Sequence, residues 1–259
     1  MAPPVDLAPP ARSGADLPPE AVESFVTSMP RRYGVLFGPR VARCHAAIAL
    51  CRQGRIAHAE VWRTLPDGTT ELCVVADDRP GLLVLIAGAL ASYRLDVMTA
   101  FIFSRATTAG REAIDFFWVR RMDGAFALEA CDTEALAERL RALMAGTLAV
   151  DDLGLHLPAG HASRVDVHFA ESNGDGSVAL VVETEDAPAL LFVMARTLFA
   201  SGVEIVRSLV RTVGSHVFNR FDIQEIDGTP LDEARRVDVC AAVAAALGGE
   251  ASPVATAEH

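Results

Sequence analysis

The chain has 259 residues and a mass of 27.5 kDa, which allows one large domain or two small ones. Hydrophobic residues make up 51% and charged residues 22%, a balance typical of globular proteins rather than disordered ones. The 34 acidic residues outnumber the 23 basic ones, and the net charge of −11 argues against nucleic-acid binding, which needs positive charge. Every basic residue is Arg, which excludes a Walker lysine, a pyridoxal Schiff base and a lysyl-attached cofactor. We therefore expect no cofactor and no nucleic-acid partner.

The cysteines indicate a reducing environment. Their number is odd and no two of them form a C-x-x-C pair, so buried thiols are the simplest interpretation. The five are Cys44, Cys51, Cys73, Cys131 and Cys240. No apolar run reaches the roughly 18–20 residues that cross a bilayer, and prolines occupy the N-terminal stretch where a signal peptide needs an apolar core. We therefore expect a cytoplasmic protein that contacts no membrane.

The first part of the chain reads as a tail followed by helices. Residues 1–19 hold six of the 14 prolines and predict a disordered or polyproline-like tail. A helical N-terminal segment, 20–55, follows; the apolar spacing predicts one helix over 18–29 and another over 39–53, which Gly54 ends. A strand over 58–65 and a Pro-Asp-Gly turn precede a strand that begins near residue 70.

An internal repeat dominates the rest of the sequence. The segments Leu72–Gly124 and Leu180–Gly228 align at one constant offset, and the final hairpin is four residues shorter in the second segment. The matched pairs include Asp78 and Asp186, Pro80 and Pro188, Leu90 and Leu198, and Phe117 and Phe221. Because many positions agree in one register, the two segments are expected to share one fold.

Each repeat predicts the same order of elements. A strand (71–76 or 178–184) runs through an Asp-x-Pro turn into a helix (80–92 or 188–201), with the proline in the first helical turn. Two strands with alternating apolar residues follow, over 95–105 and 112–121 or over 203–212 and 215–225. A second helix comes next, over 132–145 or 231–247. Asp132 or Thr133 would cap the first of these, and Gly146 and Gly248 stand where C-terminal glycines belong.

The pattern βαββα with one further strand is the ferredoxin-like split βαβ arrangement. Strands 58–65 and 164–170 would supply the further strand. The predicted fold class is therefore α+β, with two ferredoxin-like domains over 56–145 and 164–248, each a four-stranded antiparallel sheet with helices on one face. Residues 146–163 would form the linker and 249–259 a disordered tail. Since the helices cover only one face of each sheet, we expect the two domains to pack as a pseudo-dimer.

Two repeats of this size, each with a D-x-P-x-L-L turn, resemble the ACT domain, a small regulatory module that binds amino acids. TELCVVADDRPGLLVLIAGALASYRLDVMTAFIFS, followed by AIDFFWVRRMDG, is similar to the first of two C-terminal ACT domains in the PII uridylyltransferase/uridylyl-removing family. The upstream MPRRYGVLFGPRVARCHAAIAL is similar to the segment that joins the catalytic region of that family to its ACT pair. The resemblance covers residues 24–247.

The catalytic motifs of that family do not occur in this sequence. Its nucleotidyltransferase domain needs an Asp-x-Asp pair and its phosphohydrolase domain needs an adjacent His-Asp, and neither is present. No serine lies in a G-x-S-x-G motif. We therefore predict no catalytic residues and no enzymatic activity of this chain alone.

The first Asp-x-Pro turn is the leading candidate for ligand binding. The N–H groups at a helix N-terminus favour an anion such as an amino-acid carboxylate, and a glycine there allows close approach. The aspartate would take the ligand ammonium or would only cap the helix, and an empty structural turn is the alternative. The resemblance adds the start of the second strand, with Asp where Asn is expected. The predicted ligand-binding residues are Asp78, Arg79, Gly81, Leu82, Leu83, Asp96 and Val97.

The second turn predicts a weaker site, at Asp186, Ala189 and Leu190. It has Ala187 in place of the arginine of the first turn, and Ala189 in place of the glycine. We therefore predict that an amino acid binds at the first turn. Gly81→Ala should weaken that binding at least several-fold, and Ala189→Gly should change it little.

Three other patterns favour structural interpretations. The run 174–179 imitates a G-x-G-x-x-A fingerprint but leads into a strand, so it reads as a hairpin. His156 and His161 lie in the predicted linker without other ligands at metal spacing, and no metal site is expected. Cys44 and His45 point about 100° apart on a helix, so they cannot form a nucleophile–base pair.

These observations predict a non-catalytic sensor in nitrogen or amino-acid metabolism that binds a small amino acid and signals to a partner. The resemblance suggests glutamine as the ligand. The alternative is a ligand-free ACT scaffold for homodimerisation or for docking to a partner protein. A third possibility is a chain that works in trans with a separate catalytic chain.

Overall fold

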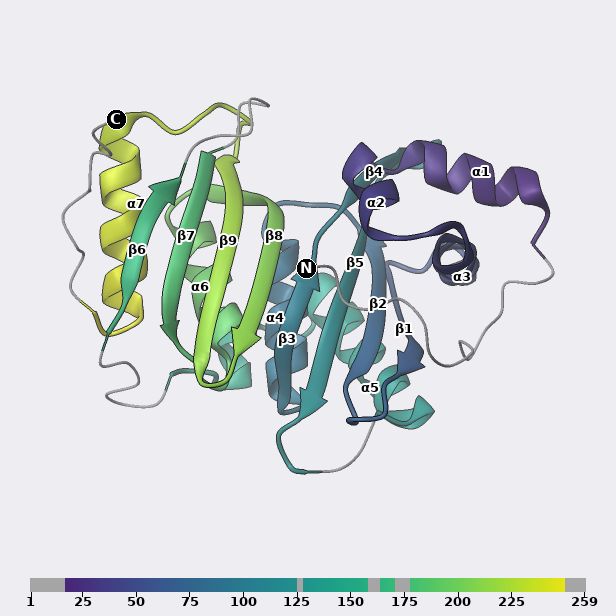
Figure 1. Cartoon of the computed structure of the whole chain (residues 1–259), viewed down its shortest axis with the longest axis horizontal. Coiled ribbons are helices and arrows are strands. Elements are labelled where there is room, and N and C mark those ends of the chain that lie inside the picture. The colour runs from purple at the N-terminus through teal and green to yellow at the C-terminus, as the bar shows by residue number, and fades with distance from the viewer. Residues whose placement is uncertain (1–16, 125–127, 158–163, 171–177, 250–259) are drawn as a thin grey trace. The chain divides into compact units, whose positions relative to one another are not determined.

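The computed structural model describes residues 17–124, 128–157, 164–170 and 178–249, which fall into two compact units (Figure 1). Unit 1 ends at Arg79 and resumes over Ile102–Leu148, while unit 2 contains Pro80–Phe101 and the chain from Ala149 onward. The predicted domain over 56–145 thus contributes one helix and one strand to unit 2. Most of both predicted tails, part of the predicted linker including His161, and most of the predicted hairpin at 174–179 lie outside the described residues.

Unit 1 is built on an antiparallel sheet with the strand order β1-β2-β5-β4. Its strands are β1 (Ala57–Thr64), β2 (Thr70–Asp77), β4 (Ser104–Thr107) and β5 (Gly110–Arg121). Its helices are α1 (Pro19–Ser28), α2 (Arg31–Leu36), α3 (Pro39–Cys51) and α5 (Ala130–Met144). The two predicted N-terminal helices are confirmed to within two residues. The six-residue α2 between them was not predicted, because so short a helix leaves no periodic pattern.

Both faces of the unit 1 sheet are buried. Phe116 and Phe117 are neighbours on β5, so they point to opposite faces, and both are buried. On the Phe116 face lie Tyr33 of α2, Phe37 just after α2, and His45 of α3, whose ring centroids are 6.2, 4.9 and 4.0 Å from the Phe116 ring. The prediction that helices cover one face only is therefore wrong for unit 1. The N-terminal helical segment packs on the second face and is part of the core.

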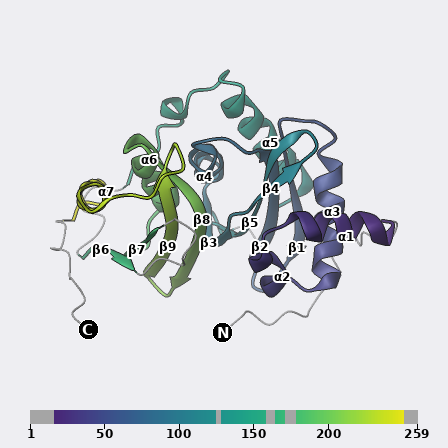
Figure 2. The same cartoon turned by 90° about the horizontal axis from the view of Figure 1, so that it is seen from above.

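Unit 2 has an antiparallel sheet with the strand order β3-β8-β9-β7-β6. Its strands are β3 (Leu95–Phe101), β6 (Asp166–Ala170), β7 (Val178–Glu185), β8 (Val203–Val213) and β9 (His216–Glu225). Its helices α4 (Leu82–Ser92), α6 (Leu190–Ala200) and α7 (Glu233–Ala246) lie on one face of this sheet (Figure 2), and a 3-10 turn (Val150–Leu153) contacts α4. Burial alternates along β9, where Val217 and Phe221 are buried and Phe218 is exposed. The α+β class with antiparallel, ferredoxin-like pairing is confirmed, but the sheet of unit 2 has five strands instead of the predicted four, because β3 of the first repeat pairs with β8 of the second.

The helices and strands of the two repeats are related by the same residue offset as the sequences. Strands β2 and β7 begin and end at matched positions, as do helices α4 and α6, and strands β3 and β8 begin at matched positions. One predicted strand differs, because 95–105 is interrupted after Phe101. Its first part, β3, pairs with β8, and its second part, β4, pairs with β5.

The ends of the last helix in each repeat follow capping chemistry. Helix α5 begins at Ala130, earlier than predicted, and Asp132 accepts the N–H of Glu129 at 3.0 Å from within the first turn. Helix α7 is capped by Asp232, which accepts the N–H of Arg235 at 2.8 Å. Gly146 and Gly248 follow these helices with positive φ angles of 71° and 80°, as predicted. In the part of the chain that the structure describes, no helix has the length and apolarity to cross a membrane.

Candidate functional site

The two Asp-x-Pro turns share one backbone conformation. In each turn the proline is followed by a left-handed residue, Gly81 with φ 76° or Ala189 with φ 62°, and the helix begins at the next residue. In the second turn the Leu190 N–H donates to the Ala187 carbonyl at 3.2 Å, the bond of a β-turn with Pro second and a left-handed residue third. Helices α4 and α6 therefore start two residues later than predicted. Proline-glycine is the sequence signature of this turn, and a helix can begin only after it.

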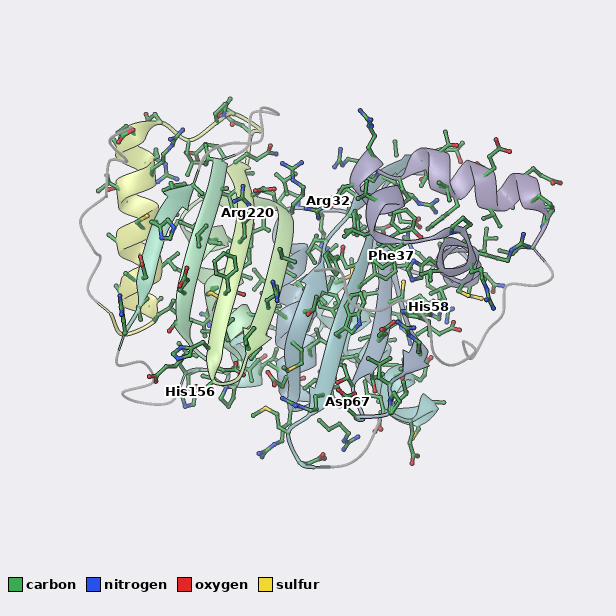
Figure 3. All side chains as sticks on the ribbon, in the orientation of Figure 1. Arg32, Phe37, His58, Asp67, His156 and Arg220 are labelled. Carbon is green, nitrogen blue, oxygen red and sulfur yellow. The ribbon has the colours of Figure 1, made fainter. Side chains whose placement is uncertain are left out.

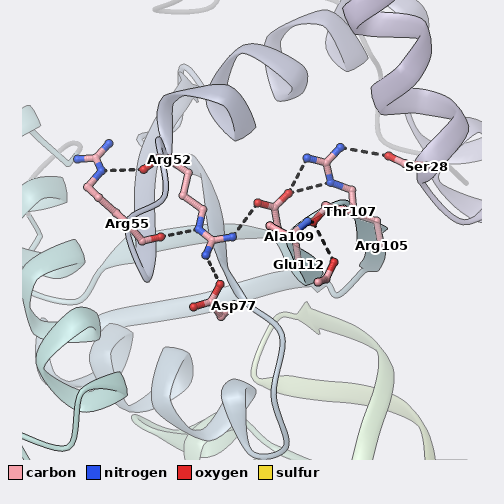
Figure 4. Close-up of polar contacts among 9 residues, drawn as sticks. Ser28, Arg52, Arg55, Asp77, Arg105, Thr107, Ala109 and Glu112 are labelled. Carbon is pink, nitrogen blue, oxygen red and sulfur yellow. Dashed lines mark hydrogen bonds and ion pairs between the residues drawn. The ribbon is translucent and has the colours of Figure 1, made fainter.

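Ion pairs hold the end of β2, from which the chain enters the first turn (Figure 4). Arg52 pairs with Asp77 and also with one oxygen of Glu112, at 2.8 Å. The other oxygen of Glu112 accepts the Arg105 Nε–H at 2.8 Å, and Arg105 also donates to Ser28 on α1 at 3.1 Å. The network ties α1, the residue that follows α3, strand β2 and the β4–β5 hairpin together one residue before the turn.

Asp78 has a cationic partner within unit 1. Its carboxylate pairs with Arg111 at 3.0 Å, and its backbone N–H donates to the Arg111 carbonyl at 3.2 Å. Arg79, half-buried, is the last residue of unit 1 before the turn passes into unit 2. A ligand ammonium at Asp78 would have to compete with the Arg111 guanidinium.

The rest of the first turn lies in unit 2 and is filled by protein groups. The Gly81 N–H donates to the Glu204 carboxylate at 3.2 Å. The Phe199 ring covers the glycine, because a Cβ built there would lie 3.0 Å from it. Leu83 lines the space that remains, which is about 10 Å³, while Leu82 is buried. A single water needs roughly 10–15 Å³, so this turn offers little room for a ligand.

The second turn lines a larger cavity. Asp186, Ala189 and Leu190 form one side of it, and Asp96 and Val97 at the start of β3 form another. Its volume is about 30 Å³, enough for roughly two water molecules. The structure thus brings Asp96 and Val97, which the sequence grouped with the first turn, to the second turn.

Each turn faces the strand start of the other repeat. The offset that aligns Asp78 with Asp186 also aligns Asp96 with Glu204. The carboxylates of Asp96 and Glu204 therefore occupy matched positions in the two repeats. The Glu204 carboxylate accepts the Gly81 N–H and occupies the space at the first turn. Asp96 is one methylene shorter, and a cavity remains beside it at the second turn. This difference of one methylene is a physical reason why the cavity at the second turn is larger than the one at the first turn.

Asn219 on β9 also lines this cavity and was missed by sequence reasoning. Its side chain is fully buried; the amide nitrogen donates to Met194 Sδ at 3.7 Å, and the amide oxygen has no hydrogen-bond partner among the described residues. A visible signal was its place between Val217 and Phe221, in a run of alternating apolar positions that face the core. A polar residue at such a position needs a reason.

Asp115 holds the matched position in the first repeat, two residues before Phe117 as Asn219 is two before Phe221. It is 1% exposed and accepts the Phe103 N–H at 3.2 Å. Burial raises the pKa of its carboxyl well above the usual range. Both repeats therefore keep a buried polar side chain at this position, but with different partners.

Cys44, His45 and His156, which the sequence singled out, do not line the spaces at the two turns. His45 accepts or donates a 2.8 Å hydrogen bond with the Tyr33 hydroxyl inside the unit 1 core, and burial lowers its pKa well below the usual value. Burial likewise raises the pKa of the Cys44 thiol. His156, labelled in Figure 3, is exposed, and its Nδ1 lies 3.0 Å from the Gly154 carbonyl oxygen. Within the described ranges no three His, Cys, Asp or Glu side chains gather as a metal site.

No protein-family model matches the chain. It is similar to curated bifunctional uridylyltransferase/uridylyl-removing enzymes, among them that of Streptomyces coelicolor, with 31% identity over 176 residues, which are 64% of this chain and 21% of that enzyme. The enzymes of Phenylobacterium zucineum and Rhodospirillum rubrum are 27% identical over 223 and 229 residues, 83% and 84% of this chain. Those residues make up 23% and 24% of the two enzymes, so the chain spans about a quarter of their length or less. The resemblance to this family is confirmed.

Proposed function

We propose that this chain is a regulatory module of nitrogen or amino-acid metabolism that binds a small amino acid through two ACT domains. Its similarity to part of the uridylyltransferase/uridylyl-removing enzymes supports this role, as does the ferredoxin-like element order that occurs twice along the chain. Glutamine is the ligand that the family resemblance favours. We place the protein in the cytoplasm on its cysteine pattern, an odd number without a C-x-x-C pair.

The cavity at the second turn carries this proposal, because both repeats line it and its charges suit a free amino acid. The first N–H groups of α6 have no partner within the helix, and the helix dipole favours an anion there. Asp96 and Asp186 line the same cavity and supply carboxylates for an ammonium. An amino acid carries both charges on neighbouring atoms, so it complements this arrangement better than a simple anion or cation does.

We propose the second turn as the site in place of the first, and two observations support this choice. At the first turn, Glu204 already accepts the N–H that a ligand carboxylate would use, and Phe199 covers the glycine. At the second turn the matched carboxylate is the shorter Asp96, and the cavity is about three times larger in volume. We therefore propose one ligand per chain, with Asp186, Ala189, Leu190 and Asp96 around it.

The proposed mechanism is linkage between ligand binding and conformation. A ligand at this cavity touches the turn of one repeat and the strand start of the other. It therefore favours the conformations in which these parts are together, and its differential affinity sets how far the population shifts. A partner protein or a second copy of the chain that prefers the same conformations would bind more tightly when the ligand is present.

A thermal-shift screen against the twenty amino acids tests the proposal. A ligand at 100 times its dissociation constant should stabilise the chain by about 2.7 kcal/mol, a shift of roughly 5–10 °C. Calorimetry on Asp96→Ala should then show an affinity at least tenfold weaker, because a charge-assisted hydrogen bond of about 1.5–3 kcal/mol is lost. Asp78→Ala, at the first turn, is the matched control and should bind as the parent does. A screen without any shift would rule the function out.

A ligand-free scaffold is the second candidate. The filling of the first turn by Glu204 and Phe199 favours it, since the protein has replaced a ligand with its own side chains at one of the two places. In that case the screen stays flat, and light scattering or a pull-down shows a dimer or a complex that no amino acid affects.

No catalysis is proposed for the chain alone, because the sequence lacks the motifs that its relatives' reactions need. Purified chain would be incubated with UTP and an unmodified PII-type protein, and separately with the uridylylated form. Either transfer or removal of the uridylyl group would overturn this part of the proposal. Activity that emerges only with an added catalytic chain would support action in trans.

A further inference from the structure

The amide of Asn219 is a buried polar group that the protein itself leaves half satisfied. The side chain is 0% exposed, its nitrogen donates to the Met194 sulfur at 3.7 Å, and its oxygen has no partner among the described residues. A thioether is a weak acceptor and not a donor, so this contact fixes the nitrogen on the sulfur side and leaves the oxygen as an open acceptor.

The surroundings of Asn219 give no structural reason for a polar residue. The side chains next to it in the cavity wall include Val210 and Val217, which are buried and apolar. More than nine in ten buried polar groups have a partner, and an apolar residue of similar shape at an unsatisfied position is neutral or stabilising. The amide therefore lowers the folding stability of the ligand-free protein. A role in ligand binding would explain why the protein keeps it.

We propose that Asn219 selects the ligand by accepting a hydrogen bond from an uncharged donor group, an amide or a hydroxyl, at the end of the ligand side chain. This inference rests on the proposed amino-acid binding at the second turn. The cavity of about 30 Å³ has room for two or three heavy atoms, so the end of the ligand side chain would enter it, while the ligand's ammonium and carboxylate would stay at its rim near Asp96, Asp186 and the start of α6. Asp96 and Asp186 in the same lining repel a carboxylate side chain, and an aliphatic side chain leaves the Asn219 oxygen unpaired.

The first repeat supports the assignment by contrast. Its matched residue, Asp115, is equally buried, but its carboxyl oxygen accepts the Phe103 N–H. A polar side chain at this position can thus be satisfied by the backbone of its own repeat. In the second repeat the amide oxygen has no such donor among the described residues, and that repeat is the one whose turn lines the larger cavity.

Calorimetry with near-isosteric ligand pairs on the full chain tests the inference. Threonine is compared with valine, and glutamine with methionine, so that each pair differs chiefly in a hydrogen-bond donor. For the pair that binds, we expect the parent protein to favour the donor-bearing member by about 3- to 10-fold, the effect of one net hydrogen bond. Asn219→Val should bring that ratio to about one. Ser208→Ala is the matched control, because it also removes a buried polar group that lacks a partner among the described residues, on β8 and outside the cavity lining, and it should keep the parent ratio.

The melting temperature of the ligand-free variant separates a binding role from a structural one. If Asn219 selects ligand at the expense of stability, Asn219→Val should melt no lower than the parent protein. A marked drop would mean that the amide supports the fold and would overturn the inference. If Asn219→Val fails to fold, the ratio of affinities measured on the parent protein still tests the inference. Equal affinity for both members of each pair, or a preference for the aliphatic member, would overturn the inference. Binding with an unchanged ratio in Asn219→Val defeats this inference alone, whereas the absence of any amino-acid binding defeats the proposed function as well.

Discussion

Replacing Asp115 with Asn should stabilise the protein at neutral pH. The carboxyl is 1% exposed on β5, burial raises its pKa well above the usual value, and the Phe103 N–H at 3.2 Å opposes this only in part. Asn keeps a carbonyl oxygen for that N–H and brings no charge. It is also the residue that the second repeat holds at the matched position, Asn219, so the backbone of such a strand accommodates it.

The magnitude and its pH dependence follow from proton binding. In the unfolded chain Asp115 titrates near 3.8, and in the folded chain it titrates higher, so the folded state holds the extra proton between these two pH values. The stability of the parent protein therefore falls as pH rises above about 3.8, by up to roughly 1.4 kcal/mol per pH unit, until the pH passes the folded pKa. Asp115→Asn removes this dependence. We expect a gain of about 1–3 kcal/mol at pH 7, comparable to the cost of one uncompensated buried polar group, and little gain near pH 3.5.

Urea denaturation followed by circular dichroism, at steps between about pH 3.5 and 8, measures this difference. Asp67→Asn is a control of opposite sign. The Thr69 N–H lowers the pKa of the Asp67 carboxyl, so the native carboxylate stabilises the fold at neutral pH and this stabilisation is lost as pH falls. Asp67→Asn should therefore cost stability at neutral pH and less at low pH. A difference between Asp115→Asn and the parent that does not change with pH would refute the reasoning. So would a loss of stability at pH 7.

Three further substitutions test the packing described above. Glu204→Ala removes the acceptor of the Gly81 N–H and should lower the free energy of unfolding by about 0.5–1 kcal/mol in a urea titration; no change would mean that the contact is not formed in solution. Ala189→Gly places glycine at a φ of 62° and should raise that free energy by about 0.5–1 kcal/mol, and a loss would show that the turn is not left-handed. Tyr33→Phe leaves Nδ1 of the buried His45 without its 2.8 Å partner and should lower the denaturation midpoint by an amount that corresponds to about 1–3 kcal/mol.

The order of elements could be predicted because local signals and the repeat agree. Alternating strands, helical spacing and terminal glycines each mark the same boundaries twice, once in each repeat. The position of the N-terminal helices could not be predicted in this way, since it depends on which face of the sheet they cover. One signal was available: Leu72–Ala76 is apolar throughout rather than alternating, which is typical of a strand buried on both faces.

The candidate site was predictable in part. The Asp-x-Pro turns were found because a turn is local in sequence, and their matched backbone follows from the repeat. Asp96 was expected beside Gly81 and lies beside Ala189, because a sequence shows which residues follow one another and not which repeat a strand start will face. The repeat alignment matches Asp96 with Glu204, but it does not show which turn each of these side chains lies against. Asn219 was missed because one polar residue in a strand carries no motif.

The pairing of β3 with β8 joins an edge of one repeat to an edge of the other, through positions such as Thr99 with Arg211 and Phe101 with Leu209. If the two repeats were separate chains, this pairing and the cavity beside it would exist only above a threshold protein concentration. A covalent connection makes the association intramolecular, with an effective concentration that dilution does not change. The cavity therefore has the same walls in a cell that makes a few copies of the protein as in one that makes thousands, and its occupancy can follow the concentration of a ligand alone.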